Sequence, residues 1–232
     1  MTDLRVLHVT CDLHPASGGT SVAVSQLADA FAEIPGVRVA LLFQHRSGEP
    51  ALFPSSGCVD SYMVVTESGI LTRTGLGLRK RLKELTGAHA PSLIHSHGLW
   101  LPVNHWAARV ARQTGTPLIT HVHGMLEPWA LGHKSCKKRF AMLAYQSADI
   151  GVAKALIATS AQEYENLRSL GLKQPIAVIP NGVKLPEKPH EIENSRGRVD
   201  FHGVSRNHGF LRDQRAGPGQ AGESGEYHRQ AV

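Results

Sequence analysis

The chain has 232 residues, of which 41% are hydrophobic and 19% are charged. This length is enough for one large domain or two small ones, and the composition excludes a wholly disordered chain and a membrane-spanning protein. The net charge of +6 permits binding of phosphates, nucleic acid or an anionic membrane surface without selecting among them. Three scattered cysteines and the lack of a secretory signal pattern favour a reducing, cytoplasmic setting.

The N-terminal segment predicts a strand, a glycine-containing loop and a helix. Residues 5–10 form a short apolar run, and the loop that follows contains Pro15, Gly18 and Gly19. Residues 20–34 have apolar positions at helical spacing and end at a Pro-Gly pair, after which a second strand is expected over 37–43. A βαβ unit therefore opens the chain.

The same alternation continues to residue 180. We expect further strands over 61–65, 92–98, 116–124, 155–160 and 174–180, with helices over 75–85, 103–115, 137–149 and 161–172. Unbroken apolar runs are typical of strands that are covered on both faces, and right-handed crossovers return each strand beside its predecessor. The sequence therefore predicts an α/β fold with about seven strands in an open, doubly wound parallel sheet, Rossmann-like in type.

The composition changes after this region. We expect residues 1–183 to form the folded domain and residues 184–232 to form a linker and an irregular tail. From residue 196 onward the chain is poor in aliphatic residues and has no sustained period. We interpret the tail as disordered, and as the product of a frameshift near residue 196.

The loop at Ser17, Gly18 and Gly19 is the first candidate site. Glycines here allow backbone N–H groups to approach a phosphate at the N-terminus of a helix, and a tight βα turn without a ligand is the alternative. The three-glycine dinucleotide fingerprint is absent, and no acidic residue ends the second strand to hold a ribose. A nicotinamide-dependent enzyme is therefore disfavoured.

Paired histidines on two predicted strands form the second candidate site. His95 and His97 share one face of their strand, as do His121 and His123, because side chains two residues apart point the same way. Ligands bind at the carboxyl ends of such strands, so we expect His97 and His123 to reach a ligand and His95 and His121 to be core residues. A metal site is disfavoured because no acidic residue joins the histidines at ligand spacing.

Basic residues gather in two further segments, 79–83 and 133–139. The second opens a predicted helix, where cations oppose the helix dipole, which indicates binding of an anion or a membrane surface. A solvated basic face is the alternative for both segments. The sequence contains no P-loop, no G-x-S-x-G nucleophile motif and no Asp-x-Asp pair of the kind that holds a metal diphosphate.

Several segments together resemble family 4 of the retaining glycosyltransferases, and more narrowly its bacterial members that build lipopolysaccharide or exopolysaccharide. The resemblance covers about residues 4–183. The segments are the Ser-Gly-Gly loop, HSHGLW at 95–100, HVHGMLEPWAL at 121–131, ATSAQEYENLRSLGL at 158–172 and VIPNGV at 178–183.

The resemblance implies the GT-B fold, in which two Rossmann-like domains face a cleft, with no metal and no cofactor. This chain resembles the N-terminal, acceptor-side domain. By analogy Gly18 and Gly19 lie at the donor diphosphate and His123 is the catalytic position at the donor sugar. The acceptor pocket is expected to include His97, Trp100 and Glu127.

The implied activity is transfer of a sugar from a nucleotide-sugar to a glycan or lipid-linked acceptor in polysaccharide biosynthesis. No pair of glutamates eight positions apart, which the family's C-terminal domain carries, is present, so we expect the chain alone to be inactive. Expected partners are the donor, the acceptor and an anionic membrane surface, but no nucleic acid; the expected location is the cytoplasm or the inner face of the membrane. A non-catalytic acceptor-binding domain of a split enzyme and a histidine-metal hydrolase remain alternatives.

Overall fold

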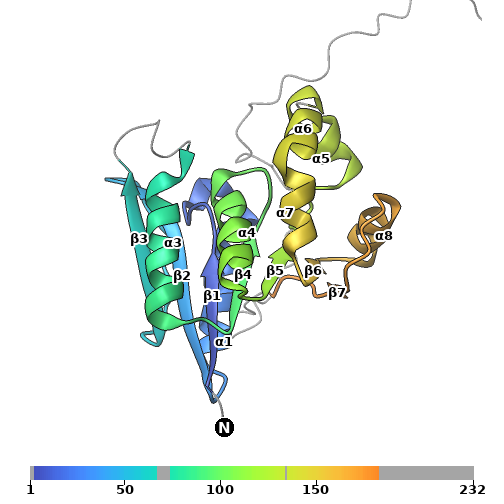
Figure 1. Cartoon of the computed structure of the whole chain (residues 1–232). Coiled ribbons are helices and arrows are strands. Elements are labelled where there is room, and N and C mark those ends of the chain that lie inside the picture. The colour runs from blue at the N-terminus through green and yellow to red at the C-terminus, as the bar shows by residue number, and fades with distance from the viewer. Residues whose placement is uncertain (1–2, 67–73, 134, 183–232) are drawn as a thin grey trace, which may run out of the picture. The chain divides into compact units, whose positions relative to one another are not determined.

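The computed structural model describes residues 3–66, 74–133 and 135–182 of the chain (Figure 1). Within these ranges seven strands form one sheet in the order β3-β2-β1-β4-β5-β6-β7, and every neighbouring pair is parallel. The predicted open, parallel, Rossmann-like sheet is confirmed. The strands are β1 (Leu4–Val9), β2 (Val37–Arg46), β3 (Val59–Thr66), β4 (Leu93–His97), β5 (Leu118–His121), β6 (Ala155–Ala158) and β7 (Ile176–Val178).

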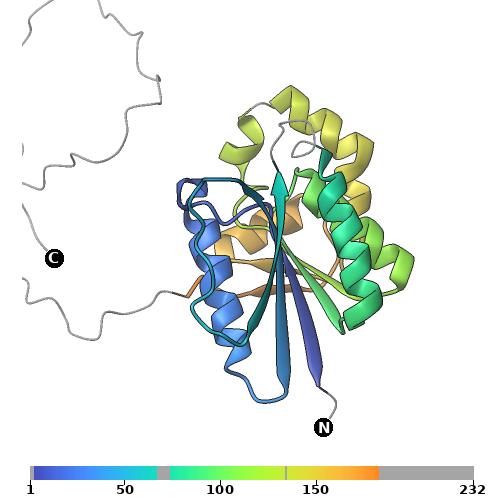
Figure 2. The same ribbon diagram turned by 90° about the vertical axis from the view of Figure 1, so that its left-hand side faces the viewer.

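Helices cover the sheet from both sides, as unbroken apolar strands require. Figure 2 shows α1 on one side of the sheet and α3 and α4 on the other. The helices are α1 (Gly19–Ala32), α3 (Leu76–His89), α4 (Pro102–Thr114), α5 (Pro128–Gly132), α6 (Ser135–Ala141), α7 (Ser147–Val152) and α8 (Ala161–Ser169). In the described part of the chain, none of them has the length and apolar composition of a membrane-spanning helix.

The two faces of the sheet differ in their packing. The α3 and α4 side holds a large aliphatic core, which includes Leu78 and Leu82 of α3 and Val103 and Val110 of α4. The α1 side holds a smaller apolar cluster that lies mainly between α1 and β2. Its members are Leu13, Val24, Ala28, Val39, Leu41, Phe43 and Val59. This apolar cluster has no member from β4 or β5, so other side chains cover these two strands on the α1 side.

The direction of the strand order reverses between β1 and β4. Strands β1, β2 and β3 follow one another toward one edge, and β4 to β7 follow one another toward the other edge. The crossover connections from β1 and β4 consequently lie on opposite sides of the sheet, which opens a crevice at the carboxyl ends of these strands. This is the point at which the fold positions a ligand site.

The region after β5 differs from the sequence-based expectation. A single helix was expected over 137–149, whereas α6 and α7 are separated by a π-helical turn, Met142–Gln146, and α5 precedes them. The turn places Gln146 in the interior, where its Oε1 accepts a hydrogen bond from the Trp100 backbone N–H at 2.8 Å. The predicted boundary at residue 183, the 184–232 tail and its frameshift lie outside the described residues.

Replacement of Ile94 by alanine tests the central place of β4. Ile94 is fully buried in a strand flanked by β1 and β5, so Ile94→Ala should lower the free energy of unfolding by about 2–5 kcal/mol. Met63→Ala on edge strand β3, where the side chain is 43% exposed, should change it by no more than about 0.5 kcal/mol. Urea unfolding followed by circular dichroism measures both values, and equal losses would contradict the observed strand order.

Candidate functional site

Five histidines form one layer on the α1 side of the sheet, at the crevice. They are His8 of β1, His95 and His97 of β4, His121 of β5 and His123, which lies just beyond β5. In the strand register His8 is opposite His95, and His97 is opposite His121. Because residues two apart in a strand share a face, the register brings all the imidazoles of these strands together. We call this group the histidine layer.

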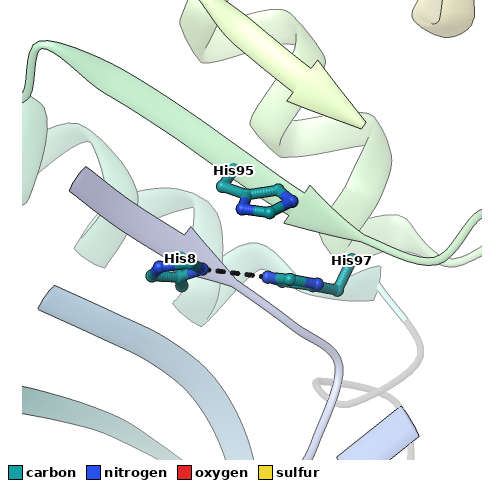
Figure 3. A group of neighbouring side chains, drawn as sticks. All are labelled: His8, His95 and His97. Atoms are coloured by element: carbon teal, nitrogen blue, oxygen red, sulfur yellow. Dashed lines mark hydrogen bonds between the residues drawn. The ribbon is translucent and has the colours of Figure 1, made fainter. Parts of the chain in front are cut away.

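The rings of the histidine layer contact one another through their nitrogen atoms and their faces. His8 Nδ1 lies 3.0 Å from His97 Nε2, as Figure 3 shows, and His97 Nδ1 lies 3.2 Å from His123 Nε2. His95 lies over His97 with 4.2 Å between ring centroids, and His121 stacks on His123 at 3.8 Å. His97 is thus the central ring of a line that runs from His8 to His123.

Burial sets the protonation state of the histidine layer. Desolvation lowers the pKa of His8 to about 4, that of His121 to about 3 and that of His123 to about 4. Desolvation also lowers the pKa values of His95 and His97 well below the usual range, and the neighbouring histidines add to the effect. The rings are therefore neutral at pH 7, and each carries one N–H donor and one lone pair.

His123 sits on a turn that a buried carboxylate holds in place. Its backbone φ is +53°, a conformation that side-chain-bearing residues rarely adopt. Glu163, which is 2% exposed, accepts hydrogen bonds from the Gly124 N–H at 2.6 Å, the Thr159 N–H at 2.6 Å and the Thr159 hydroxyl at 2.8 Å. The same carboxylate partly offsets the lowering of the His123 pKa. Glu163 therefore fixes the turn that presents the His123 ring.

A second strained turn carries Trp100. Its φ is +72°, and its backbone is held from both sides: Gln146 accepts from its N–H, and the Tyr145 hydroxyl donates to its carbonyl at 2.8 Å. The indole N–H donates to the Met125 carbonyl at 3.3 Å, and the Lys138 ammonium lies 5.5 Å from the ring centroid. Trp100 is thereby tied to the segment that follows His123.

The remaining predicted site residues have separate surroundings. Glu127 accepts a hydrogen bond from the Asn166 side chain at 2.6 Å and caps no backbone N–H of α5. Gly18 and Gly19 form the start of α1, and no heavy atom within 4 Å would meet a Cβ at either position, so the backbone there is open to approach. Gly18 has φ +85°, which explains why glycine occupies this position.

A cavity of about 180 Å³ lies between α1 and the histidine layer. His95, His97, His121 and His123 are among its lining residues, although the surface exposed to it is almost entirely apolar. The rest of the lining comes from α1, from β6 and from the end of the described chain: Ala23, Gln26, Leu27, Ala30 and Phe31 of α1, Ile157 of β6, and Ile179, Pro180, Asn181 and Gly182. The structure therefore brings His97 and His123 to one cavity, whereas Gly18, Gly19, Trp100 and Glu127 are not among the residues that line it.

Three residues at this site were missed from the sequence. His8 is opposite His95, and its signal was its position in the first strand combined with the doubly wound order, which places β1 beside β4. Glu163 stands three residues after the N-cap Ser160, a spacing that usually indicates only a capping box. Gln146 gave no signal, because a regular helix was expected there.

Most of the described chain matches one known protein family. The family described as glycosyl transferase 4-like domain matches residues 18–182. No curated protein matches the sequence significantly.

Solved structures of similar fold include UDP-GlcNAc 2-epimerase from Neisseria meningitidis bound to UDP-GlcNAc, at 12% identity and a TM-score of 0.54, covering 77% of this chain and 47% of that one. Sucrose-phosphate synthase from Thermosynechococcus elongatus has 16% identity and a TM-score of 0.52, covering 76% and 48%. S. aureus MnaA with UDP has 12% identity and a TM-score of 0.53, covering 75% and 43%. The chain spans less than half the length of these structures, and the likeness concerns the fold.

Burial of neutral imidazoles predicts acid sensitivity. The unfolded chain takes up protons at these positions below about pH 6.5, whereas the folded state does so only near pH 4 for His8, so stability is present above pH 6.5 and is lost between pH 6.5 and 4. Each such histidine should cost about 2 kcal/mol of unfolding free energy at pH 5 relative to pH 7. We expect His8→Leu to reduce this loss and His133→Ala, at an exposed position, to leave it unchanged.

Urea unfolding at pH 7 and pH 5, with EDTA present, measures the loss. An unfolding free energy in the wild-type chain that is the same at both pH values would contradict the burial of neutral rings.

Proposed function

The chain belongs to the glycosyl transferase 4-like domain family, and we propose that it forms the acceptor-side half of a retaining enzyme that transfers a sugar from a nucleotide-sugar to a glycan or lipid-linked acceptor. The observation that carries this proposal is the cavity that the histidine layer and α1 enclose at the reversal of strand order. Ligands of open α/β sheets bind at this place. Polysaccharide or lipopolysaccharide assembly is the process we propose it serves.

His123 is the residue we assign to the reacting sugar. It lines the cavity, and its neutral ring can donate or accept a hydrogen bond with a sugar hydroxyl without bringing a charge into the site. Glu163 and the 3.2 Å contact of His123 Nε2 with His97 Nδ1 leave the ring little freedom, which lowers the cost of orienting it against a ligand. His97 lines the same cavity, but its two ring nitrogens contact His8 and His123. We therefore propose that His97 acts on the sugar mainly by positioning the His123 ring.

We assign the donor diphosphate to Gly18 and Gly19 and the acceptor to the side that carries Trp100 and Glu127. The N-terminus of the 14-residue helix α1 has no side-chain cap, so its first N–H groups and its dipole are available to an anion. Trp100 offers an aromatic surface beside the Lys138 ammonium, and such surfaces suit sugar rings and anionic acceptors. The Neisseria epimerase of similar fold binds a nucleotide-sugar, UDP-GlcNAc, which is consistent with this donor class.

In this proposal a second domain completes the donor site. The solved structures of similar fold are more than twice as long as the part that this chain matches. A helix N-terminus contributes about 0.3–2 kcal/mol to holding an anion, whereas micromolar affinity requires about 8 kcal/mol. The opposing domain would contact the nucleobase and ribose and exclude water from the transfer step.

Weak binding of nucleotide-sugars by the isolated chain is the expected result. Saturation-transfer NMR with UDP-GlcNAc and other nucleotide-sugars should give a dissociation constant near or above about 1 mM, or about 4 kcal/mol of binding free energy. His123→Asn, in which asparagine tolerates the positive φ, should reduce the signal, and His133→Ala should not. No sugar transfer is expected from the chain alone.

Micromolar binding would show that the chain carries a whole donor site and would contradict the two-domain proposal. Signals that are equal in the wild type and in His123→Asn would contradict the role of His123. Binding of an acceptor glycan with no nucleotide-sugar signal would favour a non-catalytic acceptor-binding domain.

Exposed apolar side chains close in sequence to basic residues support the proposed contact with an anionic membrane. Trp129, Phe140 and Leu143 are 76%, 74% and 88% exposed, and they come from α5, α6 and the π-helical turn. Lys137 and Arg139 are exposed on α6, and in the sequence both lie between Trp129 and Phe140. Apolar side chains interleaved with cations favour the interface of a bilayer that contains acidic lipids, where each cation contributes about 1 kcal/mol.

Vesicle sedimentation tests this contact. The chain should sediment with vesicles of phosphatidylcholine and phosphatidylglycerol and less with phosphatidylcholine alone, since the cations require an acidic surface. Phe140→Ser should weaken sedimentation. Phe53→Ser should not, because Phe53, which is 51% exposed, lies outside the 129–143 segment. Equal sedimentation of the two variants would contradict the assignment of Phe140 to the membrane contact.

A further inference from the structure

Several ring nitrogens of the histidine layer are buried without a partner. Among the described residues, His8 Nε2, His95 Nε2 and both ring nitrogens of His121 have no hydrogen-bond partner. A buried polar atom left in this state costs about 1–3 kcal/mol, and such groups in native proteins usually meet an ion or an ordered water. These nitrogens therefore point to something the protein atoms do not supply.

Three of the histidines bring ring nitrogens close to one another. His97, His121 and His123 each offer one ring nitrogen, and the three atoms lie within 4.8 Å of one another. The pair His97 Nδ1 and His123 Nε2 is 3.2 Å apart, close to the roughly 3.3 Å between ligands that tetrahedral zinc requires with Zn–N bonds of about 2.0–2.1 Å. We propose that His97, His121 and His123 bind a divalent first-row transition-metal ion of the zinc type.

The fold fixes the backbones that carry these ligands. The rings of His121 and His123 are stacked with their planes only 15° apart, so at least one of them turns about its side-chain torsions when both nitrogens bind one ion. His97 and His121 are opposite each other in paired strands, and the Gly98 N–H donates to the His121 carbonyl at 2.8 Å, so their backbones are fixed. Glu163 fixes the His123 turn through Gly124. Because the backbones are fixed, the entropic cost of binding is limited to the reorientation of these rings.

His8 serves as the outer partner of the site. If the His97 Nε2–H donates to His8 Nδ1, at 3.0 Å, then His97 Nδ1 keeps its lone pair for the ion (Figure 3). Metal-bound histidines usually donate their second ring N–H in this way. The alternative group of His8, His95 and His97 also brings three ring nitrogens within 4.8 Å, but it shares His97, and His8 does not line the cavity.

The ligand chemistry selects the class of ion. An all-imidazole set suits zinc, nickel or copper and does not suit magnesium or calcium, which take oxygen ligands. A water molecule would supply the fourth ligand of a tetrahedral ion bound by three imidazoles. The sequence disfavoured a metal because no acidic residue accompanies these histidines, and the structure supplies the geometry that the spacing did not reveal.

The site does not depend on sugar transfer. If His123 also meets the donor sugar, then a metal ion and the nucleotide-sugar compete for it. The experiment therefore uses the metal alone, so that its result is independent of the proposed activity.

Zinc affinity of the whole purified chain, measured by competition with a chromophoric chelator, tests the proposal. We expect His121→Phe, which keeps a ring in the stack, and His123→Asn each to weaken zinc binding by at least about 10-fold. His133→Ala should bind as the wild type does, because it keeps all three ligands. Zinc binding that remains in His123→Asn reports binding by other histidines of the chain. Cobalt should give the intense visible absorption of a four-coordinate site in the wild type and in His133→Ala, but not in the two ligand variants.

The variants also separate the possible outcomes. Circular dichroism confirms folding, and the half-buried position 123 provides the test if His121→Phe fails to fold. Equal zinc affinity in the wild type and His123→Asn, or no four-coordinate cobalt spectrum, would overturn the proposal. Loss of binding in His8→Leu with retention in His123→Asn would place the ion in the other histidine group and would also overturn it.

Discussion

Burial of five neutral imidazoles in one layer is the constraint on which the rest of this site depends. Removing charged rings from water is so unfavourable that the histidines stay unprotonated, and neutral rings can then approach one another within 3.0–3.2 Å through N–H to lone-pair contacts. A line from His8 through His97 to His123 results. This line crosses from β1 to β4 and ends at the cavity, so the core of the sheet and the ligand site are physically continuous.

The two faces of the sheet have different roles: one holds most of the aliphatic core, and the other carries the histidine layer. The side covered by α3 and α4 holds a continuous aliphatic core, and it carries most of the apolar burial. The α1 side replaces aliphatic side chains by histidines where β4 and β5 end. A polar layer with unpaired nitrogens is tolerable there because the opposite face supplies the packing. The same arrangement explains how a site with strained turns at Trp100 and His123 can be held in place.

Sequence reasoning reached the fold because its evidence was local. Apolar runs, Pro-Gly breaks and helical spacing identify elements from neighbouring residues, and the alternation of side chains along a strand puts His95 beside His97 and His121 beside His123 on one face. The contact of His8 with His97 required knowing which strands are adjacent, and that is a property of the whole sheet. Glu163 was hidden for a similar reason: its hydrogen bond to Gly124 joins residues 39 positions apart.

The π-helical turn Met142–Gln146 carries both an exposed apolar residue and the residues that hold the Trp100 backbone. Leu143 is exposed on the surface, while Tyr145 and Gln146 bond to the carbonyl and the N–H of Trp100. A π-helical turn contains one more residue than the α-helical path around it, and each residue of an α-helix turns the chain by about 100°. Deleting a single residue here would restore a regular helix, yet it would rotate α7 relative to α6 and withdraw both hydrogen bonds from Trp100. This segment should therefore tolerate substitutions in evolution far better than changes in its length.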